Sequence, residues 1–442
     1  MPSVKRYENL VGNGGTVMTM RNTTANNNGS FVPSANDTVL VTADNVRKIA
    51  AKLPVHVASI LGALTKIENG SLTATLPDGA TYRFVAKNKG PDADITLHNW
   101  KLPRRALISG SIGVAESYMD RDWDSKDVTS FLELFTRNYS LGSEVASSSF
   151  LLTILERLRH WMNTNTKRRS KKNISAHYDL GNKFYSLWLD KSMTYSSALY
   201  EDGANSLEAA QQAKYRHLVE RTGIGSGDKV LEIGCGWGGF AEYVGRNTDA
   251  HLTGLTISKE QLDFAQKRIF EAGLNEKIDL KFQDYREETG VYDKVASIEM
   301  FEAVGEKYWP TYFGKVSDCL KQGGKAGLQI ITISDRSFDH YRSNPDFIQK
   351  YVFPGGMLPS PSALSELSRQ SGFSEEAPHI FGHDYARTLA AWRVMFWEKW
   401  DKIRLLGFDD RFKRMWEFYM HYCEAGFQAE NIDVRQVFYK KV

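Results

Sequence analysis

From residue 229 to residue 331 the chain alternates between short apolar runs of strand length and helical segments. The first run, 229–233, leads directly into a glycine-rich turn at 234–239. Further strand-like runs follow at 251–255, 279–282, 294–298 and 325–331. Strands separated by helices pair in parallel, with helices covering both faces of the sheet. The sequence therefore predicts an α/β fold with a mostly parallel sheet.

The glycine turn is the strongest single motif. Glycines directly after a first strand let the backbone pass close to a bound nucleoside. A NAD-binding domain and a turn that merely packs are the alternatives. The second strand ends at 255–258 without the acidic residue that binds the NAD ribose, and Trp237 would crowd a pyrophosphate. Glu232, two residues before the first glycine, also favours a sulfonium cofactor, which carries no pyrophosphate.

The chain has 442 residues, which predicts two or three domains. Residues 1–40 are rich in Asn, Gly, Ser and Thr and are expected to form a flexible tail. Residues 41–150 have the pattern of a small α+β unit. In this unit Asp44 is a candidate helix N-cap, and a turn at 77–79 predicts a hairpin.

Charge and cysteine content narrow the functional class. Lys plus Arg total 56 and Asp plus Glu total 53, giving a net charge of +3. This near-balance excludes a uniformly basic nucleic-acid coat, so no nucleic-acid partner is expected. Three cysteines far apart disfavour a disulfide scaffold or a Cys-based zinc site, and no metal is expected.

Residues 151–175 are expected to form a helical, basic linker. Its segment 167–172 carries five Lys or Arg residues. This segment is either a solvated connection or a contact with anionic headgroups, at about 1 kcal/mol per basic residue. No apolar run approaches the roughly 20 residues that a spanning helix needs. The expected location is cytoplasmic, peripherally associated with the inner face of the membrane.

Ordered motifs between about 170 and 442 closely resemble the cyclopropane fatty acid synthase family of S-adenosylmethionine-dependent fatty-acyl methyltransferases, which includes the mycolic acid cyclopropane synthases. The motifs lie at 177–182, 193–197, 232–239, 254–261, 297–305, 353–360 and 384–389. The resemblance implies that 176–442 form a Rossmann-like class I methyltransferase domain with a helical lid and insertion. It also implies a lipid-engaging role for 41–150.

The resemblance also implies which residues bind S-adenosylmethionine, the co-substrate. They come from the lid, the glycine turn, the end of the second strand and the segment beside the adenine. These residues are Tyr178, Tyr195, Ser196, Glu232, Gly234, Gly236, Thr256, Ser258, Gln261, Asp284, Tyr285 and Arg286.

In the family a bicarbonate ion lies beside the transferred methyl group, held by a Cys, a Glu, a His–Thr–Ile segment and a Tyr. Glu302, Tyr385 and Ile333 match the Glu, the Tyr and the Ile. Ser197 stands where the family has the Cys, and Ile331 where it has the His. The resemblance thus implies Glu302, Tyr385, Ser197 and Ile333 as catalytic residues, with bicarbonate as a possible further ligand.

The implied reaction is methyl transfer to the cis double bond of an unsaturated acyl chain of a membrane phospholipid, closing a cyclopropane through a carbocation. A methyl-branched unsaturated product is the alternative, favoured by the replacements at Ser197 and Ile331. A non-catalytic lipid carrier and a small-molecule methyltransferase are further alternatives. A homodimer is a further expectation. The aromatic run Trp392, Phe396, Trp397 and Trp400 predicts a helix face packed in a core.

Overall fold

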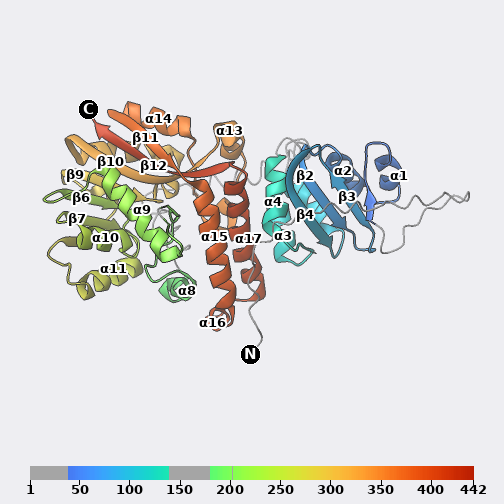
Figure 1. Cartoon of the computed structure of the whole chain (residues 1–442), viewed down its shortest axis with the longest axis horizontal. Helices are drawn as coiled ribbons and strands as arrows, with labels where there is room; N and C mark the ends of the chain where they lie inside the picture. Colours follow the sequence, from blue (N-terminus) through green and yellow to red (C-terminus); the bar gives the residue numbers. More distant parts are fainter. Residues whose placement is uncertain (1–37, 139–179, 202) are drawn as a thin grey trace, which may run out of the picture.

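The computed structural model describes residues 38–138, 180–201 and 203–442. Two sheets lie at opposite ends of the molecule, and long helices run between them (Figure 1). The predicted linker 151–175 with its basic segment, the first 37 residues of the predicted tail, and Tyr178 lie outside the described residues. Among the described residues, no helix is both long and apolar enough to cross a membrane.

The N-terminal unit is built on a five-stranded sheet with the order β1-β3-β2-β4-β5. Its strands are β1 (Thr38–Leu40), β2 (Asn69–Thr75), β3 (Thr81–Val85), β4 (Asn88–Leu97) and β5 (Trp123–Asp124). The predicted hairpin is present, because β2 and β3 pair in antiparallel fashion. The tail prediction was wrong for its last three residues, since β1 pairs in parallel with β3. That order comes from tertiary pairing, which composition does not reveal.

The described part of this unit contains the helices α1 (Val46–Ala50), α2 (Val55–Leu64), α3 (Lys101–Met119) and α4 (Val128–Arg137). The first helix is capped one residue later than predicted, at Asn45 instead of Asp44. The Asn45 side chain accepts a hydrogen bond from the Thr42 amide, which fixes the turn before the helix. Gly110 has φ 53° and kinks α3.

The second sheet has seven strands in the order β11-β12-β10-β9-β6-β7-β8. They are β6 (Lys229–Ile233), β7 (His251–Thr256), β8 (Ile278–Phe282), β9 (Tyr292–Ile298), β10 (Leu320–Ile333), β11 (Phe373–Ile380) and β12 (Ile432–Lys441). The strands from β10 to β8 pair in parallel, which confirms the predicted α/β class. The antiparallel pairs that β12 forms with β10 and β11 were not predicted.

Helices and short turns connect these strands. The α-helices are α8 (Gly181–Trp188), α9 (Leu207–Thr222), α10 (Gly239–Asn247), α11 (Lys259–Glu271), α12 (Trp309–Asp318), α13 (Asp335–Ser343), α14 (Pro361–Gln370), α15 (Gly382–Glu398), α16 (Trp400–Arg404) and α17 (Asp410–Gln428). The short turns are η1 (Tyr285–Glu287), η2 (Phe301–Ala303), η3 (Glu306–Tyr308) and η4 (Ile348–Val352). On α15 and α16, Trp392, Phe396 and Trp400 are buried as predicted, whereas Trp397 is 40% exposed.

Helix α17 joins the two units. It runs beside α15 on one side and packs against α3 and α4 on the other (Figure 1). Arg414 of α17 donates to the Trp123 carbonyl (3.0 Å) and to the Asp124 carboxylate (2.7 Å), and its guanidinium lies 3.8 Å from the Tyr118 ring centroid. The Arg414 side chain is only 14% exposed, so this contact is a largely dehydrated part of the interface.

Substituting Arg414 by Ala should therefore loosen the joint between the units. Leaving buried carbonyl oxygens without a donor costs about 1–3 kcal/mol each, so we expect R414A to lower the free energy of unfolding by about 2 kcal/mol or more. Arg411→Ala is the control, because the Arg411 pair with Asp120 is largely exposed and such pairs contribute about 0–1 kcal/mol. Urea denaturation followed by tryptophan fluorescence measures both. Equal effects of the two variants would contradict the role given to Arg414.

Candidate active site

The glycine turn after β6 lies where the order of the parallel strands reverses, with β7 on one side and β9 on the other. Ligands of open α/β sheets bind at this place, beside the carboxyl ends of the strands. The amides of Gly234 and Cys235 donate to the Leu255 carbonyl (3.0 and 2.9 Å), which ties the turn to β7. Gly234 has φ 85°, and a Cβ there would lie 2.7 Å from Met300 Cγ, so only glycine fits this position.

Glu232 places a carboxyl group within the buried strand β6. The residue is 3% exposed, and its Oε2 has no hydrogen-bond partner among the described residues. Burial raises the pKa of Glu232 to about 8. An ammonium group at the glycine turn would supply both the missing donor and the opposite charge. The turn therefore fits the amino acid portion of S-adenosylmethionine.

Two hydrogen-bonded pairs of side chains lie at the carboxyl ends of β7 and β8. Thr256 Oγ1 donates to Gln261 Oε1 (3.2 Å). Arg286 donates twice to the buried Asp284 carboxylate, at 2.8 and 2.6 Å. Ser258 is the N-cap of α11 and accepts from the Gln261 amide. Both pairs are thus fixed beside the carboxyl ends of β7 and β8, whereas Ser258 organises the start of α11.

One continuous cavity of about 1090 Å³ collects the predicted site residues. Its wall includes Tyr195, Ser196, Glu232, Gly234, Gly236, Thr256, Gln261, Asp284, Tyr285, Arg286, Glu302, Ile333 and Tyr385. Ser197 and Ser258 lie outside this wall. The cavity continues into the N-terminal unit, where it is lined by apolar side chains that include Leu61, Leu72, Phe84, Ile95 and Phe131.

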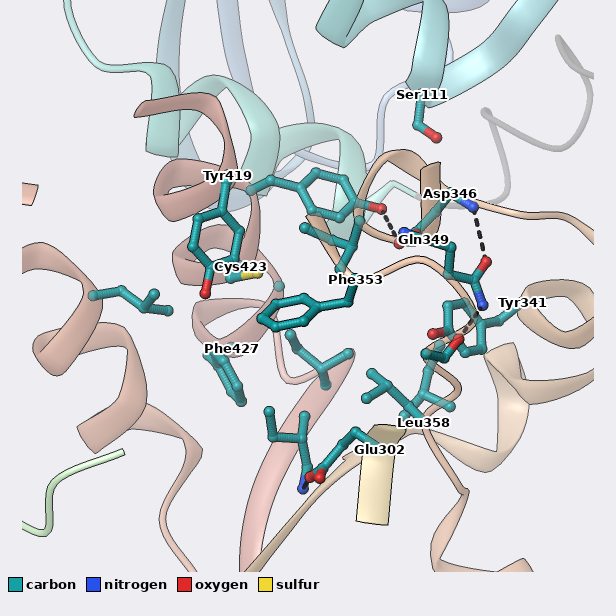
Figure 2. A pocket seen from close by; sticks show the side chains of 18 of the residues that line it. Ser111, Glu302, Tyr341, Asp346, Gln349, Phe353, Leu358, Tyr419, Cys423 and Phe427 are labelled. Atoms are coloured by element: carbon teal, nitrogen blue, oxygen red, sulfur yellow. Dashed lines mark hydrogen bonds between the residues drawn. The ribbon is translucent and has the colours of Figure 1, made fainter. Parts of the chain in front are cut away.

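A close view shows how the two parts of the cavity connect. In Figure 2, Phe353, Phe427 and Leu358 lie between Glu302 and Ser111, a residue of α3 in the N-terminal unit. The Tyr385 ring stacks on Phe427 with a centroid distance of 4.6 Å. Aromatic and aliphatic groups therefore line the path that leads from the carboxylate to the N-terminal unit.

Glu302 lies on η2 at the cavity wall. Its Oε1 accepts from the Ile331 amide (2.5 Å), while its Oε2 has no partner among the described residues. Burial, and next the neighbouring Glu299, raise the pKa of Glu302 to about 8. At neutral pH this group is therefore mainly a protonated acid.

Glu299 is the site residue that sequence reasoning missed. Its Oε1 accepts from the Ser197 amide (2.8 Å) and from Gln329 Nε2 (2.8 Å), and its Oε2 accepts from the Tyr385 hydroxyl (2.7 Å). It also has φ 48°, a left-handed backbone that side chains other than glycine rarely adopt. The motif 297–305 contains this residue, but only its position three residues before Glu302 could have drawn attention to it.

The other predicted site residues in this region are Ser197, Ile333, Ser196 and Tyr195. The Ser197 hydroxyl donates to the Ala198 carbonyl, so its backbone amide and not its side chain faces Glu299. The Ile333 side chain lines the cavity, and its amide donates to the Pro359 carbonyl. Ser196 Oγ accepts from the buried ammonium of Lys214 (2.6 Å). Tyr195 donates to the Tyr419 hydroxyl (2.8 Å) within a cluster of aromatic rings.

Comparison with known proteins places this site in a family. Residues 165–437 match the family described as mycolic acid cyclopropane synthetase, which is more than half of the chain. The chain belongs to this family. It is a methyltransferase that uses S-adenosylmethionine.

Similar proteins extend the likeness beyond the matched residues. Tuberculostearic acid methyltransferase UfaA1 of Mycobacterium tuberculosis is 35% identical over 401 residues, which covers 88% of each chain. Cyclopropane-fatty-acyl-phospholipid synthase of Escherichia coli is 37% identical over 378 residues, or 83% of this chain and 95% of that one. The crystal structure of mycolic acid cyclopropane synthase CmaA1 complexed with SAH and CTAB is 28% identical, with a TM-score of 0.58 over 61% of this chain and 98% of that one.

The Glu232 carboxyl gives a test of the cofactor site. Replacing it with Gln should weaken S-adenosylmethionine binding about 10- to 100-fold, because a charged hydrogen bond contributes about 1.5–3 kcal/mol. Since the Glu232 pKa is about 8 in the free protein, binding releases a proton, and wild-type affinity should rise from pH 6 to pH 7.5. E232Q should lack this component of the rise.

Isothermal titration calorimetry in buffers of different ionisation enthalpy measures both the affinity and the released proton. Glu288→Gln is a matched control, because Glu288 is also buried but bonds the Gly290 amide and lies outside the cavity wall. An E232Q protein that binds as tightly as wild type would remove Glu232 from the cofactor site.

Proposed function

We propose that this methyltransferase acts on the cis double bond of an unsaturated acyl chain of a membrane phospholipid and closes a cyclopropane ring. The supporting observation is the continuous cavity, which joins the glycine turn to the apolar interior of the N-terminal unit. Contact with this apolar wall would not stabilise a small polar substrate, whereas an acyl chain gains about 0.8 kcal/mol for each buried methylene group.

The names of the relatives agree with a lipid substrate. The relative from Escherichia coli is named a cyclopropane-fatty-acyl-phospholipid synthase, and the one from Mycobacterium tuberculosis a tuberculostearic acid methyltransferase. Identity to the two is similar, so these names support a fatty-acyl substrate more strongly than they support either product.

The reaction needs a dry and well-aligned site, because an isolated alkene is a very weak nucleophile. The double bond attacks the sulfonium methyl carbon, the carbon–sulfur bond breaks, and a carbocation forms on the acyl chain. Holding the two reactants in line can remove about 7–11 kcal/mol of the barrier. Aromatic side chains that line the cavity, among them Tyr385, Tyr419 and Phe427, can stabilise the cation by about 2 kcal/mol or more when desolvated.

A base must then take one proton, and its position determines the product. Loss of a proton from the new methyl group closes a cyclopropane, whereas loss from a neighbouring carbon gives a methyl-branched alkene. The carboxyl groups of Glu299 and Glu302, which follow β9, line the cavity, and we place the proton acceptor there. Cyclopropane closure is the leading product and the methyl-branched alkene the second.

Membrane association follows from this substrate and is part of the proposal. We place the protein peripherally on the inner face of the membrane, with the N-terminal unit engaging lipid. Contact with anionic headgroups and formation of a homodimer are separate expectations. Flotation with vesicles of known charge tests the former, and sedimentation equilibrium tests the latter.

A direct assay tests the function. Purified protein, S-adenosylmethionine and liposomes of cis-unsaturated phospholipid should give acyl chains heavier by one CH2, seen by gas chromatography–mass spectrometry. Resistance of the product to ozone identifies a cyclopropane, and cleavage identifies the methyl-branched alkene. No added carbon would exclude lipid methylation. Methylation of a small molecule in a lipid-free assay would support the rival enzyme class, and binding of lipid without turnover would support a carrier.

A bulky side chain in the N-terminal part of the cavity should narrow the space for the acyl chain and leave the cofactor site unchanged. Ser111 is an exposed residue of α3 that lines the cavity from the N-terminal unit (Figure 2). Overfilling a cavity costs about 1–3 kcal/mol, so Ser111→Trp should lower kcat/KM for the lipid about tenfold and leave S-adenosylmethionine binding unchanged. Ser59→Trp on α2 is the control, since Ser59 is exposed and outside the cavity wall. Equal kinetics of both variants would mean that the acyl chain lies elsewhere.

A further inference from the structure

The backbone amides and the hydroxyl at the positions that the family uses to hold a bicarbonate ion already have acceptors within this chain. The Ser197 amide and the Tyr385 hydroxyl donate to Glu299, the Ile331 amide donates to Glu302, and the Ile333 amide donates to the Pro359 carbonyl. A free anion would therefore meet donors that are in use. It would also lie close to the Glu299 carboxylate, and like charges at close range repel. The residues present do not fit a bicarbonate ion.

We infer that the Glu299 carboxylate is the resident proton acceptor of this enzyme and makes an exchangeable anion unnecessary. This inference rests on the proposed function, because it names the base for that reaction. Glu299 is part of the cavity wall, together with Glu302 and Tyr385. Three donors hold its carboxylate: the Ser197 amide from the segment between α8 and α9, Gln329 of β10, and the Tyr385 hydroxyl of α15. Such a fixed arrangement keeps the oxygen atoms in place without any change during the reaction.

Tyr385 and Glu302 are the other groups that could accept the proton, and neither is suited to it. The Tyr385 hydroxyl already points its proton at Glu299 Oε2, and burial raises the pKa of Tyr385 well above its usual value. Glu302 has a pKa raised to about 8 and is mainly protonated at pH 7. The buried Lys214 ammonium interacts favourably with the charged form of Glu299. Burial raises the pKa of Glu299 as well, whereas the Lys214 charge and the hydrogen bonds from Tyr385, Gln329 and the Ser197 amide lower it and favour the carboxylate form.

A second layer of hydrogen bonds orients these donors. Gln436 Nε2 donates to Gln329 Oε1 (3.0 Å), so the Gln329 amide group must turn its Nε2 towards Glu299. The Glu299 amide in turn donates to the Gln329 carbonyl (2.8 Å). The acceptor is thus fixed through both its backbone and its side chain.

The backbone of Glu299 has a left-handed conformation, which is strained for a residue other than glycine. A residue other than glycine in the left-handed region costs of order 1 kcal/mol or more and persists where the surroundings require it. Glycine would relieve this strain at φ 48°, but it would remove the carboxylate from the cavity. The strain is therefore consistent with a position kept for its side chain.

After methyl transfer, one C–H bond of the new methyl group breaks and its proton goes to a Glu299 oxygen. The electron pair of that bond forms the third side of the ring and neutralises the carbocation. The net change is alkene plus S-adenosylmethionine to cyclopropane, S-adenosylhomocysteine and one proton, which Glu299 later releases.

The test compares Glu299→Gly and Glu299→Gln with wild type in buffer freed of carbon dioxide, with and without added bicarbonate. Wild-type turnover should not depend on bicarbonate. Both variants should lose about 10²–10⁴-fold in kcat, the usual contribution of a positioned base. Bicarbonate should partly restore E299G, in which the space and the donors are released, and should not restore E299Q, in which the side chain still fills the site.

Glu430→Gly is the matched control. Glu430 is also a glutamate in the left-handed region, with φ 56°, but it is exposed and outside the cavity wall. It should behave as wild type, which separates the loss of the carboxylate from the relief of backbone strain. Wild-type turnover that falls when bicarbonate is removed, or full activity of E299Q, would overturn the inference.

A second readout does not depend on lipid turnover. Bicarbonate should raise the melting temperature of E299G and leave that of wild type unchanged, because only a ligand that binds the folded state stabilises it. If wild type turned over no lipid but E299G alone bound bicarbonate, the proposed substrate would fail while the assignment of the anion site would stand. Binding of bicarbonate by wild type would overturn that assignment.

Discussion

Parallel pairing of β6 with both β7 and β9 determines where chemistry can take place in this protein. Parallel strands end at the same edge of a sheet, so residues far apart in the sequence meet there. Glu232 is the last residue but one of β6, Thr256 ends β7, and Glu299 follows β9. The reversal of strand order beside β6 then opens the crevice into which these groups face. Any change that shifted this pairing would move the cofactor turn and the carboxylates together.

The second constraint is the contact of α17 with both units. This helix supplies Tyr419 and Phe427 to the cavity, and Arg414 to the interface with the N-terminal unit. A single rigid helix therefore couples the placement of the apolar cavity to the placement of the aromatic groups near the carboxylates. The packing of α17 therefore sets the distance between the apolar wall of the N-terminal unit and the carboxyl groups of the site.

The strand–helix alternation and the glycine turn were sufficient to predict the α/β class, because both follow from local pattern. The antiparallel β12 was missed, since its pairing with β10 and β11 depends on contacts across the fold. In the site, the resemblance pointed to Glu302 and Tyr385, and both line the cavity. It did not point to Glu299, because the importance of this residue lies in donors from Ser197, Gln329 and Tyr385 that are distant in sequence, and in a backbone angle that no sequence pattern displays.

The continuity of the cavity has a consequence for the mechanics of the molecule. Apolar walls from Leu72 and Phe84 on one side and Phe353 and Phe427 on the other face the same space. An apolar occupant long enough to touch all of them acts as a removable piece of hydrophobic core that both units share. Relative motion of the two units would then expose part of that occupant to water, at about 25 cal/mol per Å². The loaded protein should thus be stiffer at the α17 joint than the empty one.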